Sequence, residues 1–545
     1  MSPFRAPALA GFVLFFAAQS ARAADPPAGI WRATFPVQTR GGQQNLSLLM
    51  MFSESEGKWV ADFLDSNLGL KAEPTIDLTV NKDLVKFALK FGPNTWTFDG
   101  KVSGNRIKGS LDLGGDILLV DLLPSALKTF KDQFAVNREV LDTADTPADF
   151  FNALFPVIGK AAEKKLKPED VRAYADKAAK QAEPYGPRWQ RTVAFRLADL
   201  LAEQEPFAAI AVEQARQGER LLGRTDDIAT QLQTLDTLAR VLRKAKRDVD
   251  AKEVEGRVAK LEPRDYAEYV KTNPPFKPEE FKGRKGKGDR AVLVELFTGA
   301  ECDPCVAVDL AFDALGRSYK PAEVVLLQYH AHIPGPDPLV SKDGAARMDF
   351  YNKKDDDKAT PQIFISGKAD TSGGGPARGA RLKYQTYRET IEDLLEKPAP
   401  VKLALTAALK GDEVTAKATV SDLEKPGEKV SLRFALAEER VRYAGGNGVR
   451  YHHSVVRAMP GGPKGFPLTK ASAEQTVTAK LDDVRGANNK ALDDVVGEMK
   501  KQGADFTFSV RPMAMKNLKL VAFVQNDETN EVLQAVQVDL EAGKE

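Results

Sequence analysis

The two cysteines of this 545-residue chain, Cys302 and Cys305, stand three positions apart, directly after an apolar run at residues 291–298. Such a run followed by a Cys-x-x-Cys pair predicts a buried strand that leads through a short turn into a helix whose first turn carries both cysteines. Backbone amides and the helix dipole stabilise a thiolate there. We therefore expect Cys302 to be the exposed, more acidic nucleophile and Cys305 to resolve a mixed disulfide.

Three other interpretations of the pair stay open: a small structural disulfide, half of a metal site, and a motif that has lost its activity. The chain has no second pair of cysteines to complete a four-thiolate zinc site. A copper or zinc site would have to recruit histidine, and His330 and His332 are the candidates.

The length of the chain indicates how many domains it has, and its charge excludes some classes of binding protein. At about 100 to 200 residues per domain, the length suggests several domains. The formal net charge is +1 at pH 7, and 28% of the residues are charged. This balance excludes the strong basic field of a nucleic-acid binder and the acidic field of a polycation binder. We expect no nucleic-acid partner and no cofactor.

Residues 1–23 have the pattern of a signal peptide. Arg5 precedes an apolar run at 8–18, and Ala21-Arg22-Ala23 places small residues at the cleavage positions. The run is too short to span a bilayer comfortably, and no later segment is apolar enough to do so. We expect an exported protein of the periplasm, cell envelope or extracellular space, without an integral membrane segment after cleavage. Disulfides persist in such a compartment.

The next segments differ in the period of their apolar residues. Residues 27–123 alternate with period two between turn-forming residues, which predicts an antiparallel β domain. Residues 124–273 have a helical period in Ala-rich pairs broken by prolines, and this spacing resembles a short stack of tetratricopeptide-like hairpins. The β domain is expected to be an accessory domain, with a ligand cup as the alternative, and the helical domain a spacer, with a partner-binding solenoid as the alternative. Either domain could hold an envelope protein partner. Residues 274–290, Pro-rich and then basic and Gly-rich, predict an exposed linker.

A second apolar run, at 323–329, should form a parallel βαβ unit with the first. Thr360-Pro361 stands at the mouth of a third strand, where a proline is expected if its peptide bond is cis. A helix at about 383–396 closes the unit. The insert 330–357 begins with the two histidines, for which ordinary loop hydrogen bonding is favoured over a metal or proton-shuttle role.

This order of parts, from the strand and Cys302-Asp-Pro-Cys305 through Thr360-Pro361 to the last helix, resembles the thioredoxin fold over residues 291–398. The phrase Glu295-Leu-Phe-Thr298 also looks like a family of exported bacterial thioredoxin-like proteins. The resemblance implies thiol–disulfide exchange on protein substrates.

The resemblance also implies roles for single residues. Pro361 would be cis and pack against the cysteines, shaping the surface that receives the substrate's extended chain. Glu295, a buried acid of the first strand, would assist proton transfer to Cys305. Asp303 puts a negative charge beside the thiolate and should raise the pKa of Cys302.

Alternation returns between residues 400 and 545 and predicts a β-sandwich-like domain. The stretches 451–462 and 521–530 resemble the C-terminal domain of bacterial surface proteins that follow a thioredoxin-like module, which implies a cell-envelope location. His452 and His453 are neighbours on an expected strand, so they should face opposite sides and share no ligand.

The sequence thus predicts a multidomain α+β protein with an N-terminal all-β domain, a helical-hairpin domain, a thioredoxin-like α/β domain and a C-terminal β-sandwich-like domain. We expect an exported thiol–disulfide oxidoreductase that uses Cys302, Cys305, Pro361 and Glu295. The alternatives are copper or zinc handling and an envelope scaffold with a structural disulfide. Nothing in the sequence chooses between oxidation, reduction and isomerisation, or names the substrate.

Overall fold

The computed structural model describes residues 27–39, 42–69, 75–91, 94–353, 358–504, 506–508 and 510–540. The predicted signal peptide, 1–23, lies outside the described residues. The chain divides into two compact units: a first unit that runs to Arg224 and includes Thr237–Asp250, and a second unit of Thr225–Asp236 and the chain from Ala251. Each unit is described by itself.

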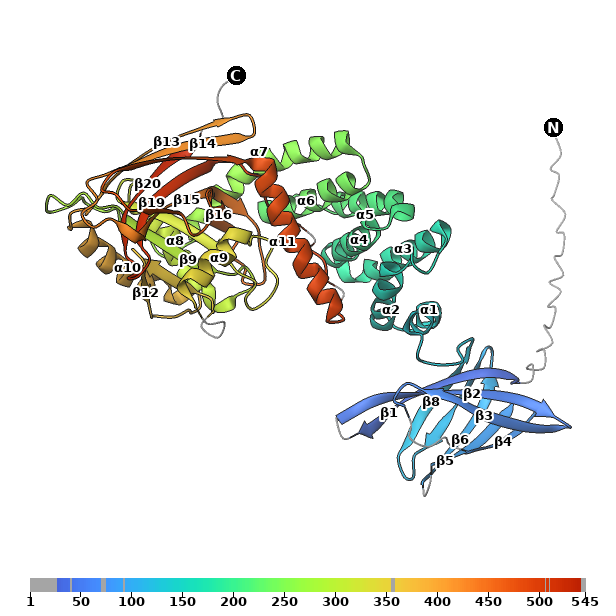
Figure 1. The fold of residues 1–545 in the computed structure, drawn as a ribbon. Helices are drawn as coiled ribbons and strands as arrows, with labels where there is room; N and C mark the ends of the chain where they lie inside the picture. The colour runs from blue at the N-terminus through green and yellow to red at the C-terminus, as the bar shows by residue number, and fades with distance from the viewer. Residues whose placement is uncertain are drawn as a thin grey trace, which may run out of the picture. The chain divides into compact units, whose positions relative to one another are not determined.

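The first unit begins with eight antiparallel strands in the order β3-β2-β1-β8-β7-β6-β5-β4. The outermost strands, β3 and β4, contact each other, so the sheet is barrel-like (Figure 1). Aromatic side chains fill its core, among them Trp31, Phe52 and Phe87. The strands are β1 (Gly29–Thr39), β2 (Gly42–Ser55), β3 (Lys58–Ser66), β4 (Thr75–Asn81), β5 (Leu84–Phe91), β6 (Asn94–Ser103), β7 (Arg106–Asp112) and β8 (Ile117–Ser125). The expected antiparallel β structure is confirmed.

Helices occupy the segment for which the sequence predicts them. They are α1 (Gln133–Thr143), α2 (Pro147–Gly159), α3 (Pro168–Ala182), α4 (Gly186–Ala202), α5 (Ala208–Arg220), α6 (Ile228–Lys244) and α7 (Asp248–Thr272). The predicted apolar faces are buried, as at Leu197 and Leu201 of α4 and Leu232 of α6. None of the helices in the described part of the chain combines the length and apolar character that a membrane span needs.

A nine-stranded sheet forms the centre of the second unit. Its order is β12-β11-β9-β10-β16-β15-β19-β20, and β17 pairs with β15. β9 and β10 are parallel, as predicted, whereas β11 runs antiparallel to β9. The strands are β9 (Val292–Thr298), β10 (Val324–His330), β11 (Gln362–Ile365), β12 (Lys368–Asp370), β15 (Gly427–Arg442), β16 (Tyr451–Ala458), β17 (Phe466–Leu468), β19 (Leu518–Asn526) and β20 (Val532–Leu540).

Helices cover both faces of this sheet around β9. Val292, Val294 and Leu296 pack with α8 (Val306–Gly316) and α10 (Ala380–Leu395) on one face. Leu293 and Phe297 point to the other face, where Met348 of α9 (Lys342–Tyr351) packs. The insert 330–357 is therefore not all loop, because it contains α9. Ser341 caps this helix by accepting a hydrogen bond from the Gly344 amide.

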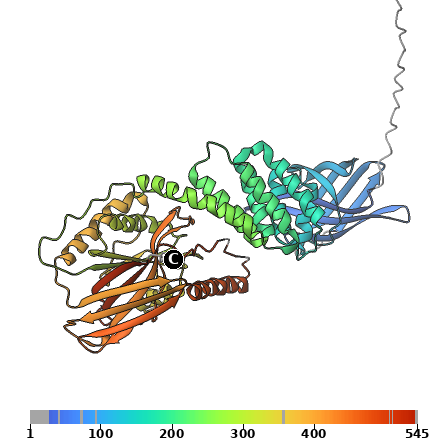
Figure 2. The same ribbon diagram turned by 90° about the horizontal axis from the view of Figure 1, so that it is seen from above.

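The segments 291–398 and 400–540 share the nine-stranded sheet, which differs from the expected separation into two domains. β10 pairs in parallel with β16 at Gln328 and Val455. The core on the α9 face combines Leu327 of β10 with Ala435 of β15 and Phe523 of β19. Figures 1 and 2 show the orange and red C-terminal strands beside the yellow-green strands of the earlier segment.

A three-stranded sheet packs on the C-terminal half of the large one. It contains β13 (Lys402–Lys410), β14 (Glu413–Ser421) and β18 (Ala473–Lys480), and its apolar residues share a core with β15, β19 and β20. Two facing sheets agree with the sandwich-like arrangement expected here. The helix α11 (Leu481–Lys501), which follows β18, was not expected.

Candidate functional site

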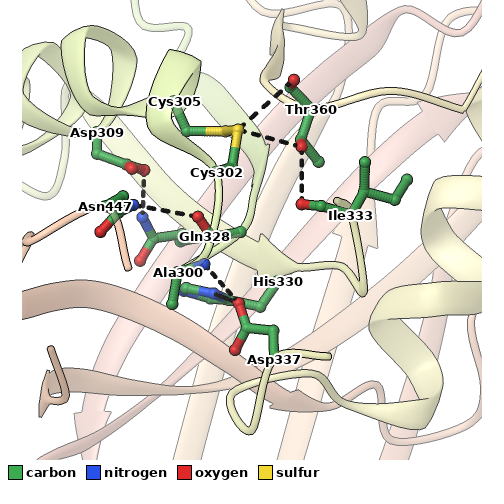
Figure 3. Close-up of a disulfide and its surroundings, with 11 residues drawn as sticks. Ala300, Cys302, Cys305, Asp309, Gln328, His330, Ile333, Asp337, Thr360 and Asn447 are labelled. Atoms are coloured by element: carbon green, nitrogen blue, oxygen red, sulfur yellow. Dashed lines mark hydrogen bonds and ion pairs between the residues drawn. A yellow bond between two sulfur atoms is a disulfide. The ribbon is translucent and has the colours of Figure 1, made fainter. Parts of the chain in front are cut away.

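The two cysteines are joined in a disulfide at the junction between β9 and α8 (Figure 3). Cys302 precedes a short 3-10 turn, Asp303–Cys305, and α8 begins at Val306. The predicted position at the start of a helix is confirmed. The expected exposure of Cys302 is wrong: it is 2% exposed and Cys305 is 0% exposed.

Two oxygen atoms of Thr360 lie close to the sulfur of Cys302. Its hydroxyl oxygen lies 3.4 Å from Cys302 Sγ and 3.1 Å from the carbonyl oxygen of Ile333, and its own carbonyl oxygen lies 3.7 Å from the sulfur (Figure 3). The hydroxyl has a single proton, and a carbonyl oxygen accepts it better than a disulfide sulfur. The Thr360–Pro361 peptide bond is cis, as predicted.

A loop from the C-terminal segment covers the turn that precedes the disulfide. We call residues 443–450, between β15 and β16, the cap loop. Asn447 Nδ2 donates to the Gly299 carbonyl oxygen at 3.1 Å, and the Asn447 amide donates to the Ala300 carbonyl oxygen at 3.0 Å. A β-carbon at Gly445 would collide with that same Ala300 oxygen, so the close approach requires glycine.

A second loop lies against the other side of the pair. The Gly375 amide donates to the Pro304 carbonyl oxygen at 2.6 Å, and the Ala307 amide donates to the Gly375 carbonyl oxygen at 2.9 Å. Gly374 packs so closely on Pro304 that a side chain would not fit. Both loops therefore bind backbone that flanks the two cysteines, whose side chains are buried.

Glu295, the residue expected to move a proton, lies on the face of the sheet opposite α8. Nε and Nη2 of Arg347 donate to its two oxygens at 2.8 Å each, and the hydroxyls of Tyr329 and Tyr351 donate at 3.0 and 2.6 Å. Burial opposes its ionisation, but the charge of Arg347 and these hydrogen bonds outweigh burial and hold the pKa of Glu295 below its usual value. These contacts pair the carboxylate with Arg347 on the face away from α8, an arrangement that does not favour the expected proton-transfer role.

A different carboxyl lies on the cysteine side. Asp309 follows Cys305 by one turn of α8, is 5% exposed, and accepts a hydrogen bond from Gln328 Nε2 at 3.2 Å (Figure 3). Burial raises the pKa of Asp309 to about 7, although the Thr298 hydroxyl favours the ionised form. Such a carboxyl accepts and releases protons near neutral pH. Sequence reasoning missed it, although an acid four residues after a cysteine in an apolar helix was a usable signal.

His330 and His332 do not join the cysteines in a metal site. His330 Nδ1 lies 2.7 Å from Asp337 Oδ2 in a fully buried pair, and His332 Nδ1 accepts the Asp337 amide at 3.0 Å. Burial lowers the pKa of His332. Within the described ranges, no group of three or more His, Cys, Asp or Glu side chains is placed to hold a metal ion. The structure therefore does not bring Cys302, Cys305, His330 and His332 together as the alternative metal site expects.

Asp337 ties the insert to the turn before the cysteines. Its Oδ2 accepts the Ala300 amide at 2.7 Å (Figure 3). Its Oδ1 accepts the Leu339 amide, also at 2.7 Å. Burial opposes the charge, but His330 and the two amides outweigh it and keep the pKa of Asp337 below its usual value. His330 and Asp337 thus position the backbone two residues before Cys302.

The neighbouring histidines of β16 have separate partners, as predicted. The His452 ring packs on His330 with centroids 4.8 Å apart, and its Nε2 donates to the Tyr443 carbonyl oxygen at 3.0 Å. Burial, and next the His330 ring, lower the pKa of His452 to about 3, so it is neutral. His453 Nδ1 lies 3.1 Å from Asp313 of α8.

Comparison with known proteins names no family. No family model and no curated protein matches the chain. Among solved structures, HBP35 of Porphyromonas gingivalis is similar over 47% of this chain and 78% of its own length, with 18% sequence identity and a TM-score of 0.33. At that TM-score the likeness is too distant to carry a fold or a role to this chain.

Proposed function

We propose that this chain is an exported protein that performs thiol–disulfide exchange on polypeptides through Cys302 and Cys305. The observation that carries the proposal is that both cysteines of the chain form one disulfide at the N-terminal edge of α8, with a proton-accepting carboxyl, Asp309, one turn away. Helix amides and the helix dipole favour a thiolate at that edge.

The arrangement around the pair supports a thioredoxin-like interpretation of residues 291–398. The strand order is β12-β11-β9-β10, in which β10 is parallel to β9 and β11 is antiparallel to β9. The helices α8 and α10 pack on one face of these strands, and α9 packs on the other. The cis Pro361 follows Thr360, the residue that contacts the Cys302 sulfur.

In the reaction proposed, the reduced pair meets a disulfide of a polypeptide. The Cys302 thiolate attacks one substrate sulfur, forms a mixed disulfide and releases the other substrate sulfur as a thiolate. Cys305 then loses its proton to Asp309 and attacks the Cys302 sulfur, which releases the second substrate thiolate and restores the Cys302–Cys305 disulfide. Two electrons pass from the pair to the substrate, and the reverse sequence oxidises a substrate dithiol.

Thr360 has a supporting role in this scheme. A thiolate is a far stronger hydrogen-bond acceptor than a disulfide sulfur. When Cys302 is reduced, the Thr360 hydroxyl at 3.4 Å is positioned to turn from Ile333 towards the sulfur and stabilise its charge.

The test uses single cysteine variants of the full-length protein. We expect Cys302→Ser to abolish the reduction of insulin disulfides, and Cys305→Ser to accumulate a mixed disulfide that a gel without reductant displays. The double variant serves as the blank for both assays. Wild-type rates in both single variants would show that the pair is not the reactive centre.

The burial of both sulfurs favours a second candidate, a static structural disulfide. The two candidates differ in reduction potential, since structural disulfides lie below about −300 mV and exchanging pairs lie higher. Equilibration of the protein with dithiol buffers of known potential decides between them, and a value below that limit would favour the structural role.

A further inference from the structure

A pocket of about 390 Å³ is lined in part by residues that adjoin the surroundings of the Cys pair in sequence. Its wall includes Glu301, which directly precedes Cys302, and Pro334, which directly follows Ile333. The pocket therefore begins one residue from the reactive cysteine and one residue from the carbonyl group that binds Thr360. The described lining residues are Glu301, Pro334, Gly335, Pro336, Tyr443, Phe506, Thr507, Phe508 and Val510.

The lining combines aromatic rings with one carboxylate. Phe506 and Phe508 stand edge to face with ring centroids 5.0 Å apart, and Tyr443 contributes a third ring. Burial, and next the charge of Glu301, raise the pKa of Tyr443 to about 12, which is consistent with a negative charge beside this ring. Aromatic faces and a carboxylate both attract cations.

The described lining of the pocket carries no cationic side chain. Among the described residues that line the pocket, none is Lys or Arg. Glu301 is half-buried, and its Oε2 accepts the Gly446 amide of the cap loop at 3.0 Å, which holds the carboxylate in place without neutralising it. The wall thus presents a fixed negative charge beside π faces, a combination suited to an ammonium or guanidinium group.

We propose that this pocket binds a Lys or Arg side chain of the polypeptide whose cysteine reacts with Cys302. The inference rests on the proposed function and narrows its substrates to cysteines that have a cationic residue one or two positions away. Because the pocket starts at the residue next to Cys302, the side chain of such a neighbour enters it when the two sulfurs meet.

The experiment compares three disulfide-linked peptides of one sequence that carry Lys, Met or Glu beside the cysteine. The full-length protein, reduced beforehand with dithiothreitol, is mixed with each peptide, and kcat/KM is measured at low and high salt. We expect Lys to exceed Met by about 5-fold at low salt, with Glu the slowest, and the preference to shrink at high salt.

Variants of the pocket localise the effect. Glu301→Gln keeps an oxygen that accepts the Gly446 amide, and it should lower the Lys-to-Met ratio to within 2-fold of unity. Phe508→Leu should lower the ratio in part, because it removes a π face and keeps an apolar side chain. Glu528→Gln, in the turn between β19 and β20 and outside the pocket, is the matched control and should leave the ratio unchanged.

The outcomes separate this inference from the proposed function. Equal kcat/KM for all three peptides, with exchange proceeding, overturns the cation pocket and leaves thiol–disulfide exchange standing. A Lys preference that survives Glu301→Gln also overturns it. Absence of exchange with every peptide, in a protein whose pair is reduced, overturns the proposed function itself.

Discussion

Folding favours the protonated form of the Asp309 carboxyl, whereas the proposed proton transfer requires its ionised form. An aspartate side chain ordinarily has a pKa of 3.8, and burial raises the pKa of Asp309 to about 7, so the unfolded chain binds fewer protons than the folded one between these values. The free energy of unfolding therefore falls as the pH rises from about 4 to just above 7, by about 4 kcal/mol in all. Proton transfer from Cys305 requires the ionised form that folding disfavours.

Asp309→Asn should raise the stability of the protein and lower its exchange rate. We expect the oxidised variant to be more stable than the wild type above pH 7, by about 4 kcal/mol, and equal to it near pH 4, because Asn does not ionise. The exchange rate should fall about 100-fold and lose its inflection near pH 7. Urea unfolding at several pH values and the pH profile of insulin reduction measure these effects. A variant that is less stable at every pH would contradict the assignment.

Glu295 presents the opposite case, a buried charge with every partner in place. Glu295→Gln leaves the guanidinium of Arg347 buried without its counter-charge, and we expect a loss of about 3 to 5 kcal/mol in the free energy of unfolding. The exchange rate per folded molecule should stay within about 2-fold of the wild type, because this side chain lies on the face away from the cysteines. A large rate loss in the folded variant would restore Glu295 to the chemistry.

The positions of some site residues could be predicted from the sequence, and those of others could not. The position of the Cys pair and the cis bond at Pro361 were predicted from local patterns. The end of a strand, the start of a helix and a proline directly before a strand can each be recognised from a few neighbouring residues. The choice between Glu295 and Asp309 depends on which face of a strand and of a helix meets the sulfurs. Strand alternation placed Glu295 on one of two faces, and only the packing of α8 and α9 decides which face bears the cysteines.

At the scale of elements, we predict that the cap loop limits access to the disulfide, because it binds the turn directly before Cys302. Asn447→Ala removes the hydrogen bond from Nδ2 to the Gly299 carbonyl oxygen and the one from the Val449 amide to Oδ1. A hydrogen bond contributes about 1 kcal/mol to such a local closure, so the rate at which dithiothreitol reduces the disulfide should rise about 5-fold. Asn152→Ala, at an exposed position of α2, is the control with an identical change of side chain. An unchanged rate in Asn447→Ala would mean that the cap loop does not limit access.

Elements joined by long-range contacts were harder to predict than elements set by local pattern. β9, β10 and α10 have strong apolar periods and lie where the sequence placed them. The helix α9 was missed within the long insert, although Ser341 followed by Asp343 is a helix-start signal. The contact of Gly445 with Ala300 has no local signal at all, because glycine in a loop is ordinary until its neighbour is known.

For the molecule as a whole, the shared sheet determines which pieces of the chain can fold. Residues 291–398 alone would expose the edge of β10 that pairs with β16, and the apolar face that packs on Ala435 and Phe523. We expect this fragment to lack a cooperative urea transition. The fragment 225–545 contains all of the second unit and should unfold cooperatively with its disulfide intact. Circular dichroism during urea unfolding tests both, and a cooperative transition in the short fragment would show that it is an independent domain.

The position of the cap loop along the chain also sets an order of events during synthesis. The Gly446 amide that binds Glu301 lies 145 residues downstream of it. At roughly 5 to 20 residues per second, the ribosome needs roughly 7 to 30 seconds to add that stretch. During this interval the nascent chain contains Cys302 and Cys305 but not yet the cap loop. An oxidant that acts on the growing chain therefore meets the pair before the cap loop is made, whereas a thiol that acts on the finished protein meets the pair with the loop in place.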